Sequence, residues 1–522
     1  MDNSKYRTFD GSGNNMSNPH WGKANTPLLR VTSASYEDNI STLAKRGGID
    51  INPRTISNTV CKQDNPKHNK NGLSDFMWAW GQFLDHEMDL SHTDASDSAD
   101  IEVPAGDEQL PSGGRIPFSR SEFDPSSGEQ AGTPRQQVNV LPAYIDASNV
   151  YGSNILRASA LRAFDGSGRL KTSNGPAGEF LPYNLAGFPN AELPGTNSAS
   201  LFIAGDIRVN EHAILTSMHT LFMREHNRLC MEIIAHDPGL FGDDETIYQQ
   251  ARKIVGGLMQ AITYNEFLPA LLGPNAISSY SGYDNSIDAS ISNIFANACY
   301  RLGHSMLSSE ISLGVHGRKI ALRDAFFDPN LVIYNGIEPF LSGLATQVMG
   351  EIDTTIVEDV RSFLFGPPNP QQQTLLDLPA INIQRGRDHG LSDYNQCRVD
   401  LGLASYTSFA EITSDTELQE KLESVYGDVN NIDPWIGCLA EDHLPGANVG
   451  EFIFTVLTDQ FTRLRDGDRY WFEHDVELSA DLQDEIRNTC LSDIIHRNTN
   501  ICELPQNVFF AQDCSIAWKK AS

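Results

Sequence analysis

Apolar residues recur at helical spacing over several long stretches of this sequence, and this periodicity constrains the fold more than any other feature. Over residues 206–236 they repeat in the pattern of a long amphipathic helix, through Ile214, Met218, Leu221, Phe222, Leu229 and Ile233. Residues 246–271 and 293–307 show the same pattern, and residues 72–90 form a further candidate helix rich in aromatic side chains. Alternating strand patterns are scarce, so the sequence predicts a mainly α fold.

Neither an internal repeat nor a clear linker divides the 522 residues. We therefore expect residues 1–522 to form a single large helical domain with little β structure. Residues 93–135 are rich in Gly, Pro and Ser and carry an excess of acidic residues. They are expected to form a long irregular surface loop.

The charge balance excludes two classes of partner. The 38 basic and 68 acidic residues give a formal net charge of −30 and a pI of about 4.7. A field of this sign repels nucleic-acid phosphates and anionic lipid surfaces. No apolar run approaches the roughly 18 residues that a membrane-spanning helix needs. We expect small-molecule partners, with neither nucleic acid nor a membrane span.

Three features bear on cellular location. The first residues, Met1–Tyr6, lack the apolar stretch of a signal peptide, so the protein is either cytosolic or separated from its leader. Two glycosylation sequons, Asn15-Met16-Ser17 and Asn39-Ile40-Ser41, fit a secreted protein. Eight cysteines allow many pairings, and Cys502 and Cys514 are near enough in sequence to close a small loop. Secretion is the leading expectation, with a lysosome-like vesicle as the other.

Two short motifs on candidate helices carry reactive side chains. Gln82 and His86 are four residues apart and share a helix face, with Asp85 beside them. Such an imidazole can act as a general base, although a hydrogen-bonded core histidine fits the same pattern. Arg208 lies three residues before Glu211, which fits a functional cluster or an exposed i,i+3 ion pair.

A third motif is Arg301-Leu302-Gly303-His304. Glycine next to histidine lets a flat ring approach the backbone closely, as a haem ligand requires. A buried structural histidine is the alternative. None of the three motifs decides the function by itself.

Together the motifs resemble the animal haem peroxidases of the peroxidase–cyclooxygenase superfamily. The resemblance runs from about residue 6 to residue 509, with its landmarks in the family's order. They are Gly81–His86, Tyr144–Gly152, Leu221–Arg228, Arg301–His304, Leu378–Gly390, Asn431–Trp435 and Leu464–Trp471. The resemblance implies a single helical haem-peroxidase domain.

The resemblance assigns roles on two sides of a haem. His86 is the expected distal base that moves a peroxide proton, and Arg208 stabilises the charge that develops as the O–O bond breaks. Gln82 is expected to orient a water or halide in the same pocket. His304 is the expected proximal ligand of the haem iron, and the carbonyl of Asn382 accepts its second N–H.

Other residues match those that hold the cofactor in the family. Arg301 and Arg385 are expected to pair with haem propionates. Asp85 and Glu211 match carboxylates that form ester bonds to a haem b-derived macrocycle. A third, sulfonium link needs a methionine directly after this glutamate, and His212 stands there. The resemblance therefore implies two ester links at most and a lower capacity for chloride oxidation.

The resemblance also implies a Ca²⁺ site, and here the sequence departs from the family. Glu87 replaces an aspartate, and Pro142 replaces a threonine and so supplies no hydroxyl. Tyr144 can still offer its backbone carbonyl, Asp146 a carboxylate and Ser148 a hydroxyl, all hard oxygen ligands. A tight turn capped by Asp146 is the alternative.

The implied activity is oxidation of ferric haem by H₂O₂ to an oxoferryl intermediate, which phenols, other aromatic donors, halides or thiocyanate then reduce. One alternative is a fatty-acid oxygenase, which needs a tyrosine three residues before the proximal histidine. Arg301 occupies that place, and Tyr300 lies one residue earlier. The other is an adhesion or matrix protein on a peroxidase scaffold, but the sequence contains neither Arg-Gly-Asp nor Lys-Gly-Asp.

Overall fold

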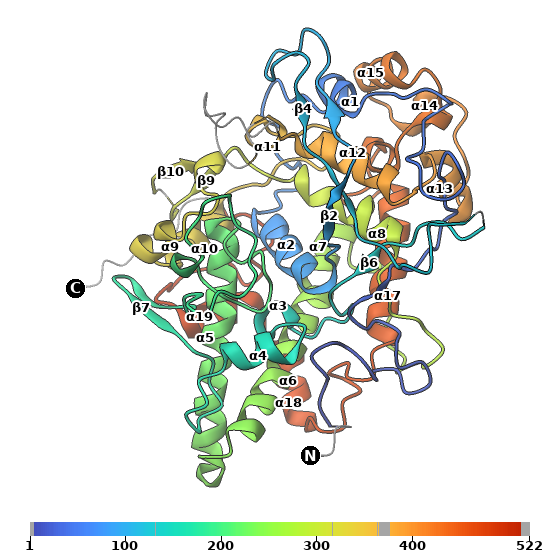
Figure 1. The fold of residues 1–522 in the computed structure, drawn as a ribbon. Coiled ribbons are helices and arrows are strands. Elements are labelled where there is room, and N and C mark those ends of the chain that lie inside the picture. The colour runs from blue at the N-terminus through green and yellow to red at the C-terminus, as the bar shows by residue number, and fades with distance from the viewer. Residues whose placement is uncertain (1–4, 131, 316, 363, 365–375, 513–522) are drawn as a thin grey trace.

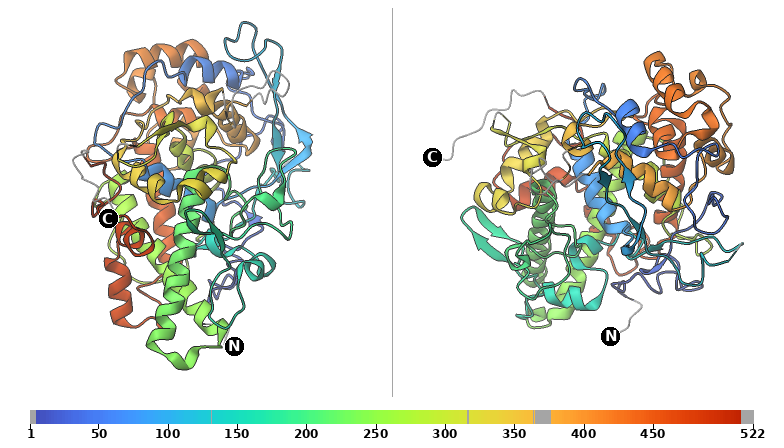
Figure 2. Two further views of the ribbon diagram at one scale, coloured as in Figure 1. Left: turned by 90° about the vertical axis from the view of Figure 1, so that its left-hand side faces the viewer. Right: turned by 45° about the horizontal axis from the view of Figure 1, so that its top comes forward.

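The longest helix, α5 (Ala213–His236), organises the packing of this protein. The computed structural model describes residues 5–130, 132–315, 317–362, 364 and 376–512. Helix α5 packs against α2 (Phe76–Met88), α6 (Asp244–Ile262), α10 (Glu338–Thr346) and α19 (Leu491–Asn498). Figure 1 shows α5 and α6 running side by side, and the views in Figure 2 agree.

Helices account for most of the regular structure, as the sequence predicts. The other α-helices are α1 (Pro53–Val60), α3 (Ser148–Tyr151), α4 (Ile155–Leu161), α7 (Leu268–Leu272), α8 (Asn293–Asn297), α9 (Asn330–Asn335), α11 (Glu358–Arg361), α12 (Leu378–Asp388), α13 (Tyr394–Asp400), α14 (Phe409–Ile412), α15 (Thr416–Tyr426), α16 (Pro434–Ala440), α17 (Glu451–Asp466) and α18 (Ala480–Asn488). Two further turns matter for the site: the π-helical η3 (Thr263–Phe267) and the 3₁₀-helical η4 (Cys299–His304).

The strands are short and form separate antiparallel pairs. They are β1 (Thr26–Pro27) with β6 (Val138–Asn139), β2 (Thr93–Ser98) with β5 (Ser119–Ser121), β3 (Ile101–Glu102) with β4 (Arg115–Ile116), β7 (Ser173–Gly175) with β8 (Gly178–Phe180), and β9 (Glu310–Ser312) with β10 (Lys319–Ala321). The sequence predicted that residues 93–135 form an irregular loop. The structure shows instead that this stretch contains two nested strand pairs, β2 with β5 and β3 with β4. Ile101 and Ile116 lie opposite each other and are buried, which anchors this excursion.

The predicted helices form, with ends that local hydrogen bonds decide. Helix α5 begins at Ala213 rather than near residue 206, because Nδ1 of His212 accepts the N–H of Leu215 at 3.2 Å and caps the first turn. Helix α6 begins two residues earlier than expected, since Asp243 caps it by accepting the N–H of Thr246. Residues 293–307 divide into α8 and η4 instead of forming one helix.

Helix α2 is buried along most of its surface. Its aromatic residues Phe76, Trp78, Trp80 and Phe83 belong to the main hydrophobic core, which extends from Leu28 to Phe509. A helix in such a position must satisfy its polar side chains within the protein, because water cannot reach them. The segments that pack around α2 therefore supply hydrogen-bond partners for these polar side chains, and the same segments form the site.

Two sequence expectations about the surface change with the structure. Asn15 is 1% exposed and donates a hydrogen bond to the carbonyl of Asn285, so its sequon is not accessible for glycosylation, whereas Asn39 is exposed. The predicted pairing of Cys502 involves Cys514, which lies outside the described residues. Among the described residues, each helix is too short or too polar to cross a lipid bilayer.

Candidate active site

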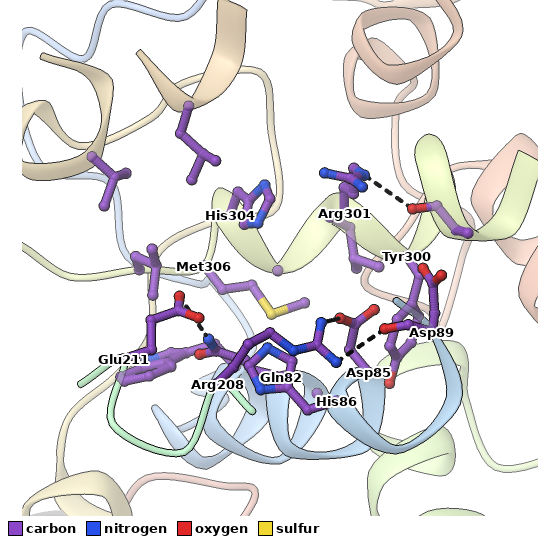
Figure 3. Close-up of a pocket in the computed structure, with 18 of the residues that line it drawn as sticks. Gln82, Asp85, His86, Asp89, Arg208, Glu211, Tyr300, Arg301, His304 and Met306 are labelled. Atoms are coloured by element: carbon purple, nitrogen blue, oxygen red, sulfur yellow. Dashed lines mark hydrogen bonds and ion pairs between the residues drawn. The ribbon is translucent and has the colours of Figure 1, made fainter. Parts of the chain in front are cut away.

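A cavity of about 340 Å³ lies against α2 and collects most of the predicted site residues. Figure 3 shows its two opposite walls, one formed by α2 with the turn before α5 and the other formed by η4. The first wall carries Gln82, Asp85, His86, Arg208 and Glu211, and the second carries Arg301 and His304. Arg385 of α12 also lines the cavity.

His86 is held in the form of a neutral base. Its side chain is buried, and this burial, together with the charge of Arg208, lowers the pKa of the imidazole well below its ordinary value. Its Nδ1 lies 3.6 Å from Oδ1 of Asp206 and has no hydrogen-bond partner among the described residues. An uncharged imidazole in this position can accept a proton at neutral pH.

Arg208 is fixed by Asp206 rather than by Glu211. Its Nε donates to Oδ1 of Asp206 at 2.9 Å, and its Nη2 donates to Oδ2 of Asp206 and to the carbonyl of Asp89, both at 3.0 Å. Burial alone would raise the pKa of Asp206, but Arg208 and His86 hold it below the ordinary value. The result is a permanent positive charge with a set orientation. The i,i+3 ion pair that the sequence allowed between Arg208 and Glu211 does not form.

Gln82 lies between His212 and Glu211. Because Nδ1 of His212 accepts the N–H of Leu215, its proton is on Nε2, which donates to Oε1 of Gln82 at 2.7 Å. The amide nitrogen of Gln82 then faces Oε1 of Glu211 at 3.2 Å. Burial lowers the pKa of His212 to about 3, so this ring is neutral. His212 therefore fixes the direction of the Gln82 amide, a role that its sequence position did not reveal.

The contact between His304 and Asn382 forms, but with the opposite polarity to the expectation. Nδ2 of Asn382 lies 2.7 Å from Nδ1 of His304, while Oδ1 of Asn382 accepts a hydrogen bond from Nη1 of Arg301 at 3.1 Å. The amide takes this direction because the guanidinium of Arg301 competes for its oxygen. Expected ligation through Nε2 of His304 requires the reverse arrangement, with Nδ1–H donating to Oδ1.

Arg301 and Arg385, which line the cavity together with Arg208, are withdrawn from water. Burial lowers the pKa of Arg301, and it lowers that of Arg385 to about 10. Arg385 contacts Asp388 and Ser121 at 3.0 and 2.9 Å. The hydrogen bonds of Arg301 within the described residues run to uncharged oxygen atoms of the backbone and of amide side chains. Both cations thus have capacity for a further anionic partner.

Asp85 and Glu211 are unusually weak acids. Burial raises the pKa of each to about 7, although the nearby charge of Arg208 opposes this shift. Near neutral pH, each side chain therefore spends much of its time as an uncharged carboxyl group. They stand on the same wall as His86, facing the slot between the two walls (Figure 3).

The residues present fit a haem group. A flat macrocycle between the walls would have an imidazole on each side, carboxyl groups at one face and guanidinium groups available for its propionates. The unpartnered Nδ1 of His86 and the guanidinium of Arg301, whose hydrogen bonds run to uncharged oxygens, are consistent with such a pocket. In this arrangement His304 is the residue that would hold the iron.

Three of the five predicted calcium residues, Glu87, Asp146 and Ser148, meet at the C-terminal end of α2, whereas the hydroxyl of Tyr144 donates to the carbonyl of Trp21. Oε1 of Glu87 accepts the N–H groups of Asp146 and Ala147, and the hydroxyl of Ser148 donates to the carbonyl of Glu87 at 2.9 Å. The second oxygens, Oε2 of Glu87 and Oδ2 of Asp146, are buried without hydrogen-bond partners among the described residues. Burial and mutual repulsion raise the pKa of Glu87.

Nearly the whole chain is similar to known proteins. Residues 6–509 match the family model described as animal haem peroxidase. Peroxinectin A of Dictyostelium discoideum is 34% identical over 97% of this chain and 96% of its own length. Thyroid peroxidase of Sus scrofa is also 34% identical over 97% of this chain, which spans only 60% of that relative.

Solved structures agree with this relationship. Peroxidase A from Dictyostelium discoideum superposes with a TM-score of 0.88 and 32% identity, covering 97% of this chain and 99% of that one. Fatty acid alpha-dioxygenase of Arabidopsis thaliana, at 20% identity and a TM-score of 0.79, shares the fold. The match of the family model across nearly the entire sequence is decisive, and the chain belongs to the animal haem peroxidase family.

Proposed function

We propose that this chain is a haem peroxidase that reduces H₂O₂ and oxidises small donors, namely phenols, other aromatics, halides or thiocyanate. One observation carries the proposal: a neutral His86 and a fixed Arg208 face His304 across one buried cavity. Membership of the animal haem peroxidase family supports the same activity.

The distal wall would manage the protons and charge of peroxide cleavage. Bound haem supplies a metal that binds peroxide and accepts its oxidising equivalents. His86 takes a proton from the peroxide oxygen nearer the metal and returns it to the departing oxygen, which leaves as water. Arg208, held by Asp206, stabilises the negative charge on that departing oxygen. Overall, one H₂O₂ and two hydrogen-donating phenols yield two water molecules and two phenoxyl radicals.

The proximal wall would hold the cofactor. His304 would hold the metal through Nε2, with its Nδ1 proton donated to Oδ1 of Asn382. This requires the Asn382 amide to turn, which becomes favourable once Arg301 leaves that oxygen for a propionate. Arg385 binds the second propionate from α12.

Replacing the distal base tests the proposed chemistry. We expect His86→Ala to reduce the second-order rate constant for reaction with H₂O₂ by about 10²–10⁴-fold, because general acid–base catalysis is lost. Stopped-flow absorbance measures this rate, and the Soret band reports haem content. In the unaltered protein, the rate should stay level as the pH falls through 6.5, since the pKa of His86 lies well below that value.

The matched control is His226→Gln. His226 is also buried, but it lies outside the cavity and is hydrogen-bonded to Tyr151 and Gly168. This variant should retain the rate of the unaltered protein. A His86→Ala protein with full haem content and an undiminished rate would refute the assignment.

We further propose that Asp85 and Glu211 form ester bonds to the haem. Joining a carboxyl group to a methyl group removes two electrons and two protons, so peroxide must act as the oxidant. The raised pKa values of both groups support the proposal, because an uncharged carboxyl is easier to bring against an apolar macrocycle.

Covalent attachment is measured by acid–acetone extraction and intact mass after exposure to H₂O₂. We expect haem to stay with the unaltered polypeptide, Asp85→Asn and Glu211→Gln each to retain one link, and the double variant to release all of its haem. Complete release from the unaltered protein would leave the peroxidase proposal standing and remove the ester links.

Gln82 is proposed to position a halide or water, with His212 holding its amide. The substitution His212→Asn keeps a side chain suited to capping α5 but cannot reach Gln82. We expect the KM for iodide to rise by up to about tenfold, the value of one net hydrogen bond, with kcat for phenol oxidation unchanged. Steady-state kinetics measure both, and the thermal midpoint checks the cap. An unchanged iodide KM would show that His212 does not orient Gln82.

Calcium is proposed at Glu87, Pro142, Tyr144, Asp146 and Ser148. The described residues hold no group of three or more His, Cys, Asp or Glu side chains arranged for a metal ion. Calcium would therefore depend on backbone carbonyls and the Ser148 hydroxyl beside the two carboxylates. The unpartnered oxygens of Glu87 and Asp146 support this arrangement.

Elemental analysis and thermal unfolding with a chelator test the calcium site. We expect about one bound Ca²⁺ per chain and a lower melting temperature after chelation, because removal leaves two buried carboxylates facing each other. Asp146→Asn should lose the metal and the chelator effect together. The site would be refuted if the protein contained no calcium and its melting temperature changed with neither added calcium nor chelator.

Secretion or delivery to a vesicle is proposed as the location. The exposed sequon at Asn39 supports it, because an oligosaccharide could attach there without disturbing the core.

A further inference from the structure

A series of aromatic rings runs from the cavity toward the surface. Tyr300 of η4 lines the cavity and lies 5.9 Å from Phe461 of α17, measured between ring centroids. Phe461 is 6.1 Å from Tyr264 of η3, and Tyr264 is 4.9 Å from Trp471. Trp471 is 5.8 Å from Tyr280, whose side chain is partly exposed. Each step lies within the range of direct aromatic contact.

The inner end of the series meets the proposed cofactor pocket. Figure 3 shows Tyr300 on the cavity side beside Asp85 and Asp89. The phenol of Tyr300 is buried, and its hydroxyl has no hydrogen-bond partner among the described residues. Burial, with Asp85 and Glu87 nearby, raises its pKa well above the ordinary value. Tyr300 can pass an electron, but it has no acceptor for its proton.

Trp471 differs from the other members because its proton has an acceptor. Its Nε1 donates a hydrogen bond to Oε2 of Glu473 at 3.2 Å. The other carboxylate oxygen, Oε1, accepts a hydrogen bond from Nε of Arg487 at 2.8 Å. Tyr264, by contrast, donates its hydroxyl to the backbone carbonyl of Phe461, which cannot take up a proton. A carboxylate beside an indole stabilises the positive charge that appears when the ring loses an electron. Glu473 is 26% exposed, so solvent reaches its carboxylate.

We propose that Trp471 is a second oxidation site, at which donors too large for the cavity lose one electron. The expected donors are phenolic groups carried on a polymer or another macromolecule, which would approach at Tyr280 and Glu473. This inference rests on the proposed haem peroxidase activity, because peroxide must supply the oxidant.

The electron and proton balance of the step is simple. A phenolic donor gives one electron to oxidised Trp471 and its proton to solvent, and becomes a phenoxyl radical. Trp471 has previously passed one electron through Tyr264, Phe461 and Tyr300 to the peroxide-oxidised cofactor. Each H₂O₂ takes up two electrons and two protons to give two water molecules, so two donors are oxidised per peroxide.

Core packing alone also places aromatic rings in contact, so the test must separate packing from electron transfer. Trp471→Phe keeps a ring against Tyr264 but cannot be oxidised under these conditions, and it leaves Glu473 paired with Arg487. Glu473→Gln keeps the indole and removes the charge beside it, and its single oxygen can accept from Trp471 or from Arg487 but not from each through a separate oxygen. Trp21→Phe is the matched control, because Trp21 is partly buried and lies outside this series.

The first measurement compares a polymeric with a small phenol, using tyramine-substituted dextran and guaiacol with the haem-loaded protein. We expect Trp471→Phe to lower kcat/KM for the polymer by about tenfold or more and to leave that for guaiacol unchanged. Glu473→Gln should lower the polymer value in the same direction, and Trp21→Phe should change neither.

The second measurement needs no donor. The unaltered protein is treated with one equivalent of H₂O₂ and a nitroso spin trap, and the adduct is located by peptide mass spectrometry. We expect the adduct on Trp471, with no adduct on this segment in Trp471→Phe. Because this readout uses the unaltered protein, it decides the proposal even if a variant fails to fold.

The outcomes distinguish this inference from the proposed function. No adduct on Trp471, or polymer oxidation that Trp471→Phe leaves unchanged, would overturn the second site while guaiacol oxidation sustains the peroxidase. Haem-loaded protein that oxidises neither phenol and forms no radical would overturn both.

Discussion

The burial of α2 is the constraint on which the rest of the site depends. This helix supplies Gln82, Asp85, His86 and Glu87, yet its remaining surface packs into the core. Polar groups in that position are stable only when other segments satisfy them. The loop at Asp146 binds Glu87, and the turn at Arg208–His212 binds Gln82. The irregular segments around α2 are therefore as necessary to the fold as the helices are.

Burial also sets the protonation states that the proposed chemistry needs. The same withdrawal from water lowers the pKa of His86 and raises those of Asp85 and Glu211. Asp206 alone is held fully ionised, because Arg208 donates to both of its oxygens. One cavity thus brings together a neutral base, two carboxyl groups whose pKa values lie near 7 and the ion pair of Asp206 with Arg208. Aqueous side chains of the same types would not hold these states together at one pH.

The mainly α fold could be predicted from the sequence, because the long helices have a clear apolar periodicity. Most of the cavity-lining site residues could also be identified, because they lie in motifs that occur in a recognisable order. Sequence reasoning missed Asp206 as the partner of Arg208, although the two are only two residues apart, because the turn before α5 has no periodicity. It also assumed a helix through this turn, whereas α5 begins only after the cap at His212. The strands within residues 93–135 are mostly two or three residues long, too short for alternation to reveal them. The direction of the Asn382 amide depends on Arg301, a competition that no local pattern encodes.

The aromatic series joins distant parts of the chain. Tyr300, Tyr264 and Trp471 come from segments separated by many residues, and core packing alone explains why their rings meet. Trp471 is only 3% exposed, so its N–H needs an acceptor within the protein, but packing does not require that this acceptor be a charged carboxylate. Glu473 is therefore the residue that separates a structural from a redox interpretation. If Glu473 served only as a hydrogen-bond acceptor, the single oxygen of a glutamine could still accept the indole N–H in place of that of Arg487, and electron transfer through Trp471 would be insensitive to the loss of charge.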